Sequence, residues 1–201
     1  MGELVDRVDE DDRVVGVVDR AEAIEKKWLH RVATTVCRDP RGRILVHRRS
    51  DGMSRFPGQY NWLIGGAAEA GESWEEAAVR ELGEELGVFG VPVRPVLRFL
   101  CRGEISPYWL GVHEAVVSGA IVPDPTEIAW YGWFGEEELV EAVARGEFVS
   151  DGVEALRRYL KCGRASDTLP FISRPCSPPG GTAAGGGGRW AASPGGACGW
   201  W

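Results

Sequence analysis

The segment from Gly66 to Val88 restricts what this chain can fold into more than any other part of the sequence. It reads GAAEAGESWEEAAVRELGEELGV, and from Ser73 onward it has the composition of a helix that stops at Gly87. Within that helix Glu81, Glu84 and Glu85 are spaced i, i+3 and i+4, so their carboxylates share one face. Like charges at this spacing repel by roughly 0.3 kcal/mol per pair. Folding alone therefore gives no reason for the pattern.

Clustered carboxylates suit a hard divalent cation, because Mg²⁺ and Mn²⁺ prefer oxygen ligands and tolerate retained water and phosphate oxygens. We therefore predict a metal site on this helix, with Mg²⁺ as the cofactor and Mn²⁺ as the alternative. Arg80 can pair with a carboxylate and fix its orientation. Glu72, near the start of the helix, favours the positive end of the helix dipole. Val79, Leu82 and Leu86 are predicted to face the core.

The overall charge makes such a cation necessary if the substrate carries phosphates. The chain has 23 Lys and Arg against 30 Asp and Glu, a formal charge of −7. Such a chain lacks the basic surface that binds polyanions, so we expect no nucleic-acid partner. No run of about 18 apolar residues occurs, so we expect no membrane partner either. Five cysteines without a CxxC pair favour reduced thiols and a cytoplasmic location.

Strand-like and helix-like patterns alternate along the rest of the chain. Residues 1–28 are predicted to form a β-hairpin and a short helix, packed on a main domain over 29–162. Strands in hairpin-like succession with interleaved helices favour an α+β class with a mixed sheet, not a doubly wound parallel sheet. From 163 to 201 the chain is crowded with Gly and Pro, and this low-complexity composition predicts a disordered tail.

Segment 66–88 matches the Nudix box position for position, and the chain resembles the Nudix hydrolase family. The resemblance implies the Nudix fold, an α/β/α sandwich, preceded here by the N-terminal hairpin. It also implies Mg²⁺-dependent hydrolysis of a diphosphate linkage, usually in a nucleoside diphosphate derivative, by a Mg²⁺-activated water. Glu81, Glu84 and Glu85 would then be metal ligands, and Gly66 would offer its carbonyl. Glu84 or a loop carboxylate would deprotonate the water, and a homodimer is a common assembly of the family.

A second resemblance concerns the subgroup related to isopentenyl-diphosphate isomerase, through LHR at 29–31, ILVHRRS and FPGQYNW. The isomerase carries a Cys and a His just before the box, where this chain has Gly65, Gly66 and Ala67. Proton transfer at carbon then lacks its acid/base pair, so we prefer the hydrolase to the isomerase. His30 corresponds to a metal ligand of the isomerase. A Nudix domain that only binds a ligand is a further alternative, against which the intact box argues.

Several residues outside the box are weaker candidates. Glu127, after a Pro-rich turn, is predicted to be an accessory metal ligand or base, and a solvated loop acid fits equally well. Arg48 and Arg49 are predicted to clamp substrate phosphates, against a solvent-facing alternative. Aromatic side chains are candidates for stacking on a base, although such residues usually belong to the core; they are Tyr60, Trp62, Trp109, Trp130 and Trp133. The three histidines, His30, His47 and His113, are expected to be structural or exposed.

Overall fold

The structure is a computed structural model that describes residues 2–166. In chain order its elements are β1 (Leu4–Val8), β2 (Val14–Asp19), α1 (Arg20–Glu25), β3 (Arg31–Arg38), β4 (Ile44–Arg49), β5 (Tyr60–Asn61), β6 (Ile64–Ala67), α2 (Trp74–Leu86), β7 (Arg94–Cys101), β8 (Tyr108–Val116), β9 (Ile128–Phe134), α3 (Glu136–Arg145) and α4 (Ser150–Ser166). Helix α4 thus continues past residue 162, where the sequence predicts the tail to begin. The remainder of the predicted tail, 167–201, lies outside the described residues.

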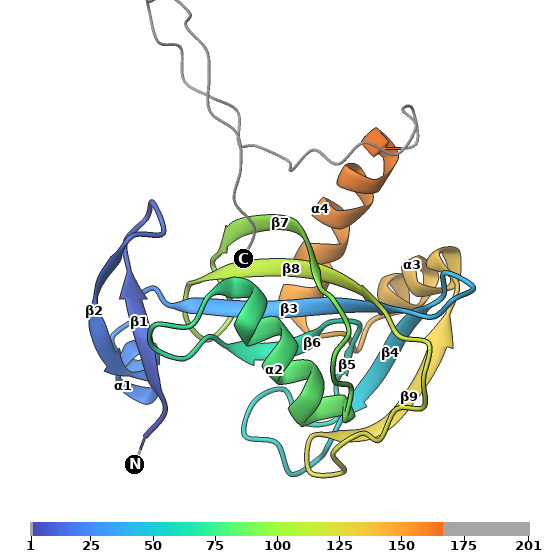
Figure 1. Cartoon of the computed structure of the whole chain (residues 1–201), viewed down its shortest axis with the longest axis horizontal. Helices are drawn as coiled ribbons and strands as arrows, with labels where there is room; N and C mark the ends of the chain where they lie inside the picture. Colours follow the sequence, from blue (N-terminus) through green and yellow to red (C-terminus); the bar gives the residue numbers. More distant parts are fainter. Residues whose placement is uncertain (1, 167–201) are drawn as a thin grey trace, which may run out of the picture.

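A mixed sheet of seven strands forms the middle layer of the molecule. Its strand order is β5-β4-β3-β8-β7, with β6 beside β3 and β9 beside β4. Strands β3 and β8 run parallel, and the other pairs in this sheet are antiparallel. Helix α2 lies across one face of the sheet, and α4 lies on the other (Figure 1). The predicted α+β class, with helices on a mixed sheet, is confirmed.

Successive side chains of a strand point to opposite faces of the sheet, so apolar residues of one strand pack in both layers. On β4, Ile44 and Val46 pack in the layer that includes α4, whereas Leu45 packs with Leu82 and Leu86 of α2. Trp62 is fully buried in the α4 layer, and its indole nitrogen donates to the Gly152 carbonyl oxygen at 2.9 Å. That bond fixes the start of α4 against the sheet.

Helix α2 begins and ends where its sequence predicts. Ser73 and Glu76 form a reciprocal capping box at its start, and Gly87 ends it in the left-handed conformation, with φ of 63°. The prediction that Val79 faces the core is wrong, because its exposed fraction is 38%. The helix buries Ala78, Leu82 and Leu86, which are four residues apart, and Val79 lies beside that stripe.

The N-terminal unit, which we define as β1, β2 and α1, packs against the main sheet at the left of Figure 1. The Val8 amide donates to the Leu29 carbonyl oxygen, and the Ala70 amide donates to the Leu4 carbonyl oxygen, each at 2.9 Å. Val5 and Ala23 bury their side chains together with Ala67 of β6. This docking places α1 close to the end of β6 that leads into α2.

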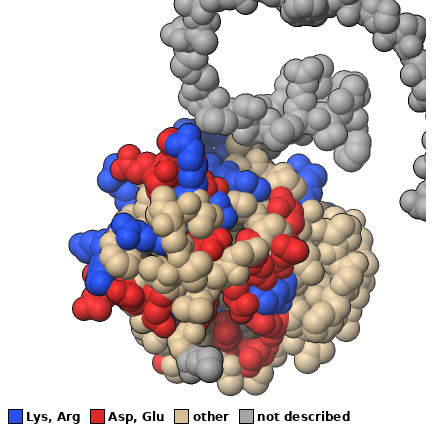
Figure 2. All heavy atoms as spheres, turned by 60° about the vertical axis from the view of Figure 1, so that its left-hand side comes forward, with Lys and Arg blue, Asp and Glu red and all other residues tan. Residues whose placement is uncertain are grey.

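On the face seen in Figure 2, Lys and Arg side chains are interspersed with Asp and Glu. No helix within residues 2–166 has the length and apolar character needed to cross a membrane.

Candidate active site

The guanidinium of Arg80 contacts carboxylates of α2 and of the turn that precedes this helix. It forms a two-pronged ion pair with Glu72, with Nε 3.0 Å from Oε1 and Nη2 3.1 Å from Oε2. Its Nη1 donates to Glu81 and to Glu84, each at 2.9 Å, and Nη2 also donates to the Ala67 carbonyl oxygen at 2.9 Å. One cation therefore orients three carboxylates and ties α2 to β6.

The three glutamates at positions 81, 84 and 85 lie at different depths. The side chain of Glu84 is 61% exposed and that of Glu81 is 12% exposed, whereas Glu85 is buried. Glu85 accepts a hydrogen bond from the Gly65 amide at 2.8 Å. A Cβ at Gly66 would lie 2.6 Å from Oε1 of Glu81, so only glycine permits this close approach of β6 to the carboxylate. We call Glu81, Glu84 and Glu85 together the acidic wall, and it lies against the backbone of Gly65 and Gly66.

The buried carboxylates of the acidic wall resist ionisation. Burial raises the pKa of Glu81 to about 7 despite Arg80, and the charges of Glu84 and Glu127 add to the shift. Burial, Glu81 and Glu127 raise the pKa of Glu85 well above its usual range. Among residues 2–166, no three His, Cys, Asp or Glu side chains form a ready-made metal cage. Arg80 engages Glu81 and Glu84, and the carboxylate oxygens of the wall are the donor type that a hard cation prefers.

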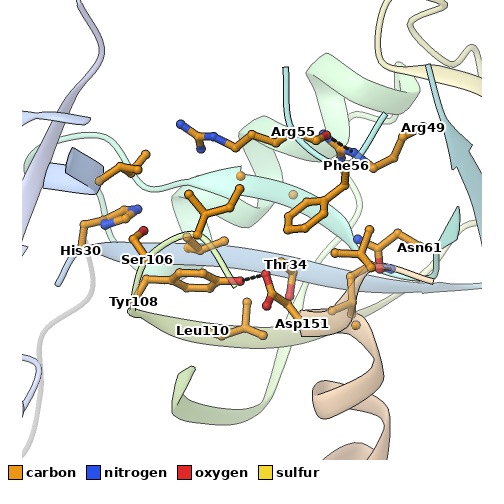
Figure 3. A pocket seen from close by; sticks show the side chains of 18 of the residues that line it. His30, Thr34, Arg49, Arg55, Phe56, Asn61, Ser106, Tyr108, Leu110 and Asp151 are labelled. Atoms are coloured by element: carbon orange, nitrogen blue, oxygen red, sulfur yellow. Dashed lines mark hydrogen bonds between the residues drawn. The ribbon is translucent and has the colours of Figure 1, made fainter. Parts of the chain in front are cut away.

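A cavity, drawn in Figure 3, adjoins this wall. Gly65 and Gly66 line the cavity, and the same two residues lie against Glu85 and Glu81. Its apolar lining comes mainly from the sheet, with Val32, Leu63 and Leu110. At its floor the Tyr108 hydroxyl donates to the Asp151 carboxylate at the start of α4. Burial and the Asp151 charge raise the pKa of Tyr108, so its proton stays on the phenol. The cavity can hold an apolar or aromatic group and offers Asp151 as a hydrogen-bond acceptor.

The two arginines predicted to bind phosphate, Arg48 and Arg49, have different surroundings in the structure. Arg49 lines the cavity, whereas Arg48 forms an ion pair with Asp51, with Nη2 2.7 Å from Oδ1. Neighbouring residues of a strand point to opposite faces, so one strand end cannot aim both at one ligand. Glu127 is half-buried, and its charge acts on Glu81 and Glu85. It therefore lies near the acidic wall, as an accessory acid or base would.

The other sequence candidates occupy mainly structural positions. The aromatic residues considered for stacking do not line the cavity; they are Tyr60, Trp62, Trp109, Trp130 and Trp133. His30 lines the cavity and is buried, and burial lowers its pKa to about 4. His47 and His113 are buried and face the carbonyl oxygens of Leu63 at 3.1 Å and Thr34 at 3.0 Å. Sequence reasoning did not single out Arg20, Arg55, Tyr108 or Asp151, because only tertiary packing brings them to one cavity.

His47 gives a prediction for stability at acidic pH. Burial lowers its pKa from 6.5 to about 4, so the unfolded chain takes up a proton at a higher pH than the folded protein does. The free energy of unfolding should fall as pH drops from 6.5 to 4, by up to ~3 kcal/mol from this group. Denaturant titrations across this range should show a shallower fall for His47→Gln. Equal slopes for the two proteins would contradict the prediction.

The positions where an isomerase would need its acid and base are closed in this chain. Gly65 has φ of 147°, and a Cβ there would lie 2.1 Å from the Ala33 carbonyl oxygen. Ala67 is fully buried and packs against the N-terminal unit. A side chain at position 65 would require the backbone to move, and a larger side chain at position 67 would disturb the packing with Val5 and Ala23.

The fold agrees with comparisons with known proteins. The model of the NUDIX domain family matches residues 28–158, and the chain belongs to the Nudix family. An uncharacterized Nudix hydrolase of Streptomyces coelicolor is 43% identical over 159 residues, which cover 78% of this chain and 87% of that protein. The uncharacterized Nudix hydrolase YfcD of Escherichia coli K12 is 30% identical over 159 residues, which cover 79% of this chain and 87% of that protein.

Solved structures show the same fold. The crystal structure of DR0079 from Deinococcus radiodurans matches with a TM-score of 0.68 and 31% identity, covering 78% of this chain and 99% of that one. A MutT protein from Methanosarcina mazei matches with a TM-score of 0.57 and 19% identity, over 68% and 94% of the two chains. The predicted Nudix fold is confirmed, and family membership indicates a hydrolase of pyrophosphate-type bonds.

Proposed function

We propose that this protein hydrolyses a diphosphate linkage in a nucleoside diphosphate derivative, with Mg²⁺, or Mn²⁺ in its place, as cofactor. The observation that carries the proposal is that the acidic wall of α2 lies beside a cavity lined by Arg49, with Gly65 and Gly66 between the two. The carboxylates of the acidic wall suit a cation, and the guanidinium of Arg49 suits an anion. A diphosphate ester needs both, because charge on its oxygens must be neutralised while its organic group is held.

The metal would be held by Glu81, Glu84, Glu85 and the carbonyl oxygen of Gly66. When bound, a divalent cation neutralises charge on diphosphate oxygens and lowers the pKa of the attacking water. Arg80 sets the positions of Glu81 and Glu84 through its two bonds of 2.9 Å. It therefore belongs to the proposed catalytic set as the group that orients the carboxylates.

The chain's own groups supply proton transfer and binding. Glu84 is the most exposed of the three glutamates and can accept a proton from water, and Glu127 is the second candidate base. The guanidinium of Arg49 can bind a phosphate through two parallel hydrogen bonds. Arg48 is left out of this proposal because Asp51 engages it. The pair of Tyr108 and Asp151 would contact the organic group of the substrate in the cavity.

Replacement of Glu127 by glutamine tests its part in the reaction. We expect the variant to fold normally, because the main-chain oxygen of Glu127, which accepts from the Ser50 amide at 2.8 Å, is unchanged. Turnover should fall by about 10²-fold, the typical contribution of a positioned acid or base. Turnover equal to that of the wild type would remove Glu127 from the mechanism. Glu137→Gln, which changes an exposed glutamate of α3, is the matched control.

A panel of diphosphate compounds tests the proposed reaction. Nucleoside diphosphate derivatives and isopentenyl diphosphate are incubated with the full chain and Mg²⁺, and release of phosphate or nucleotide is measured. We expect hydrolysis of at least one nucleoside derivative. Conversion of isopentenyl diphosphate to its allylic isomer would overturn the proposal in favour of the isomerase. Tight binding of a nucleotide without any turnover would favour a ligand-binding module.

We also propose that the protein acts in the cytoplasm as a homodimer. The thiols of Cys37 and Cys101 are buried and not in disulfides, as expected in a reducing compartment. Sedimentation of the full chain would give its oligomeric state, and a monomer at micromolar concentration would contradict the dimer.

A further inference from the structure

Three arginines from separate segments meet at one edge of the cavity. Arg20 begins α1 in the N-terminal unit, Arg49 ends β4, and Arg55 belongs to the loop between β4 and β5. All three also line an adjoining hollow beside Glu3. In Figure 3, Arg49 and Arg55 lie along the edge of the cavity opposite Tyr108 and Asp151. The cavity therefore has a basic edge, distinct from the acidic wall at Gly65 and Gly66.

These charges are not balanced by the residues around them. Within the described part of the chain, the one ion pair of the three arginines joins Arg20 Nη1 to Glu3 Oε2 at 2.7 Å. The Nε of Arg20 is buried and has no hydrogen-bond partner among those residues. Burial and the charges of Arg20 and Arg49 lower the pKa of Arg55. Glu3 and Asp19 line the hollow and Asp151 lines the cavity, but of these acids only Glu3 forms an ion pair with one of the three arginines. Gathering the three guanidinium groups therefore costs folding free energy.

The basic edge lies apart from the acidic wall. Arg20, Arg49 and Arg55 line both the cavity and the adjoining hollow, whereas Glu81, Glu84 and Glu85 are not among the residues that line either. Arg20 belongs to the N-terminal unit, and Arg49 ends β4. An anion held by these arginines would therefore sit apart from the proposed metal ligands.

We propose that Arg20 and Arg55, together with Arg49, form an anion site for the substrate phosphate that lies farther from Glu81, Glu84 and Glu85. This inference rests on the proposed function and extends it to the N-terminal unit, which contributes Arg20 to the site. The ligand class is an ester with at least two linked phosphates. Glu3 holds Arg20 in the free protein and competes with that phosphate.

Binding of inorganic pyrophosphate without metal tests the site directly. Calorimetry of the full chain in EDTA gives the dissociation constant and leaves hydrolysis out of the measurement. We expect Arg20→Gln and Arg55→Gln each to weaken binding about tenfold, the loss expected for one charge-assisted contact. Arg145→Gln removes the same charge from an exposed position at the end of α3 and should leave binding within about twofold. Unchanged binding in both cavity variants, or equal loss in Arg145→Gln, would overturn the site.

Glu3→Gln gives a change of opposite sign that damage to the fold cannot imitate. Because it frees the guanidinium of Arg20, it should strengthen pyrophosphate binding by about threefold. Weaker or unchanged binding would contradict the competition. The outcome is separable from the proposed function. If the arginine variants lose pyrophosphate binding while the Mg²⁺-loaded protein hydrolyses no diphosphate, the anion site stands and the hydrolase proposal fails. If hydrolysis is normal in both variants with unchanged KM, the hydrolase proposal stands and the anion site fails.

Discussion

Glu81→Gln should lower turnover of diphosphate substrates by about 10³-fold or more, the scale on which precisely placed charged groups act in catalysis. The same substitution should raise the melting temperature of the metal-free protein. Glu81 is mostly buried, and burial together with Glu84 and Glu127 opposes its ionisation. A neutral amide of the same shape removes that cost. Loss of activity with gain of stability is the pattern of a residue kept for function.

Thermal unfolding in EDTA and initial rates in Mg²⁺ measure the two halves of this prediction on the same samples. Glu141→Gln, an exposed glutamate of α3, is the control and should change neither quantity. A destabilised Glu81→Gln protein would contradict the interpretation of Glu81 as a strained carboxylate. Near-normal rates would remove it from the set of metal ligands.

Gly65→Ala is expected to have the largest effect on stability, a loss of about 3 kcal/mol or more. Its Cβ would lie 2.1 Å from the Ala33 carbonyl oxygen and 2.8 Å from the Thr34 Cα, both of which belong to the central strand β3. Backbone atoms in a paired strand cannot move aside as a flexible side chain can. The substitution should also disturb the Gly65 amide that holds Glu85 at 2.8 Å.

Gly42→Ala is the matched control for this effect, because Gly42 also has a positive φ, 81°, but no atom lies within 4 Å of its added Cβ. It should cost about 1 kcal/mol through backbone conformation alone. Denaturant titration of the two variants separates the steric part from the conformational part. Similar losses in both would mean that β6 and β3 can separate enough to admit a methyl group.

Much of the fold follows from local patterns in the sequence. The capping box of Ser73 and Glu76 and the left-handed Gly87 fix the ends of α2, and both are readable from residue types alone. A short run of apolar residues, Ile44 to Val46, predicts strand β4. The exposure of Val79 was not predictable from helical spacing alone, because Ala78 takes the buried stripe and alanine gives a weak hydrophobic signal.

The same distinction between local patterns and long-range contacts applies to the candidate site. The acidic face of Glu81, Glu84 and Glu85 is a local pattern and can be seen in the sequence. The cavity is not local, because Arg20, Arg55 and Asp151 come from segments far apart in the chain. Arg48 and Arg49 look alike in sequence, and only the direction of each side chain on β4 separates them. Long-range strand pairing sets such directions, so sequence spacing could not assign these roles.

The measurement that tests the central claim most directly compares the wild type, Glu84→Gln and Glu137→Gln on the best substrate of the diphosphate panel, with and without Mg²⁺. Glu84 is 61% exposed, so its substitution should leave the fold intact. The account predicts Mg²⁺-dependent release of product by the wild type and Glu137→Gln, and loss of at least about 10²-fold in Glu84→Gln. Equal rates for all three proteins, or hydrolysis that continues unchanged in EDTA, would contradict it.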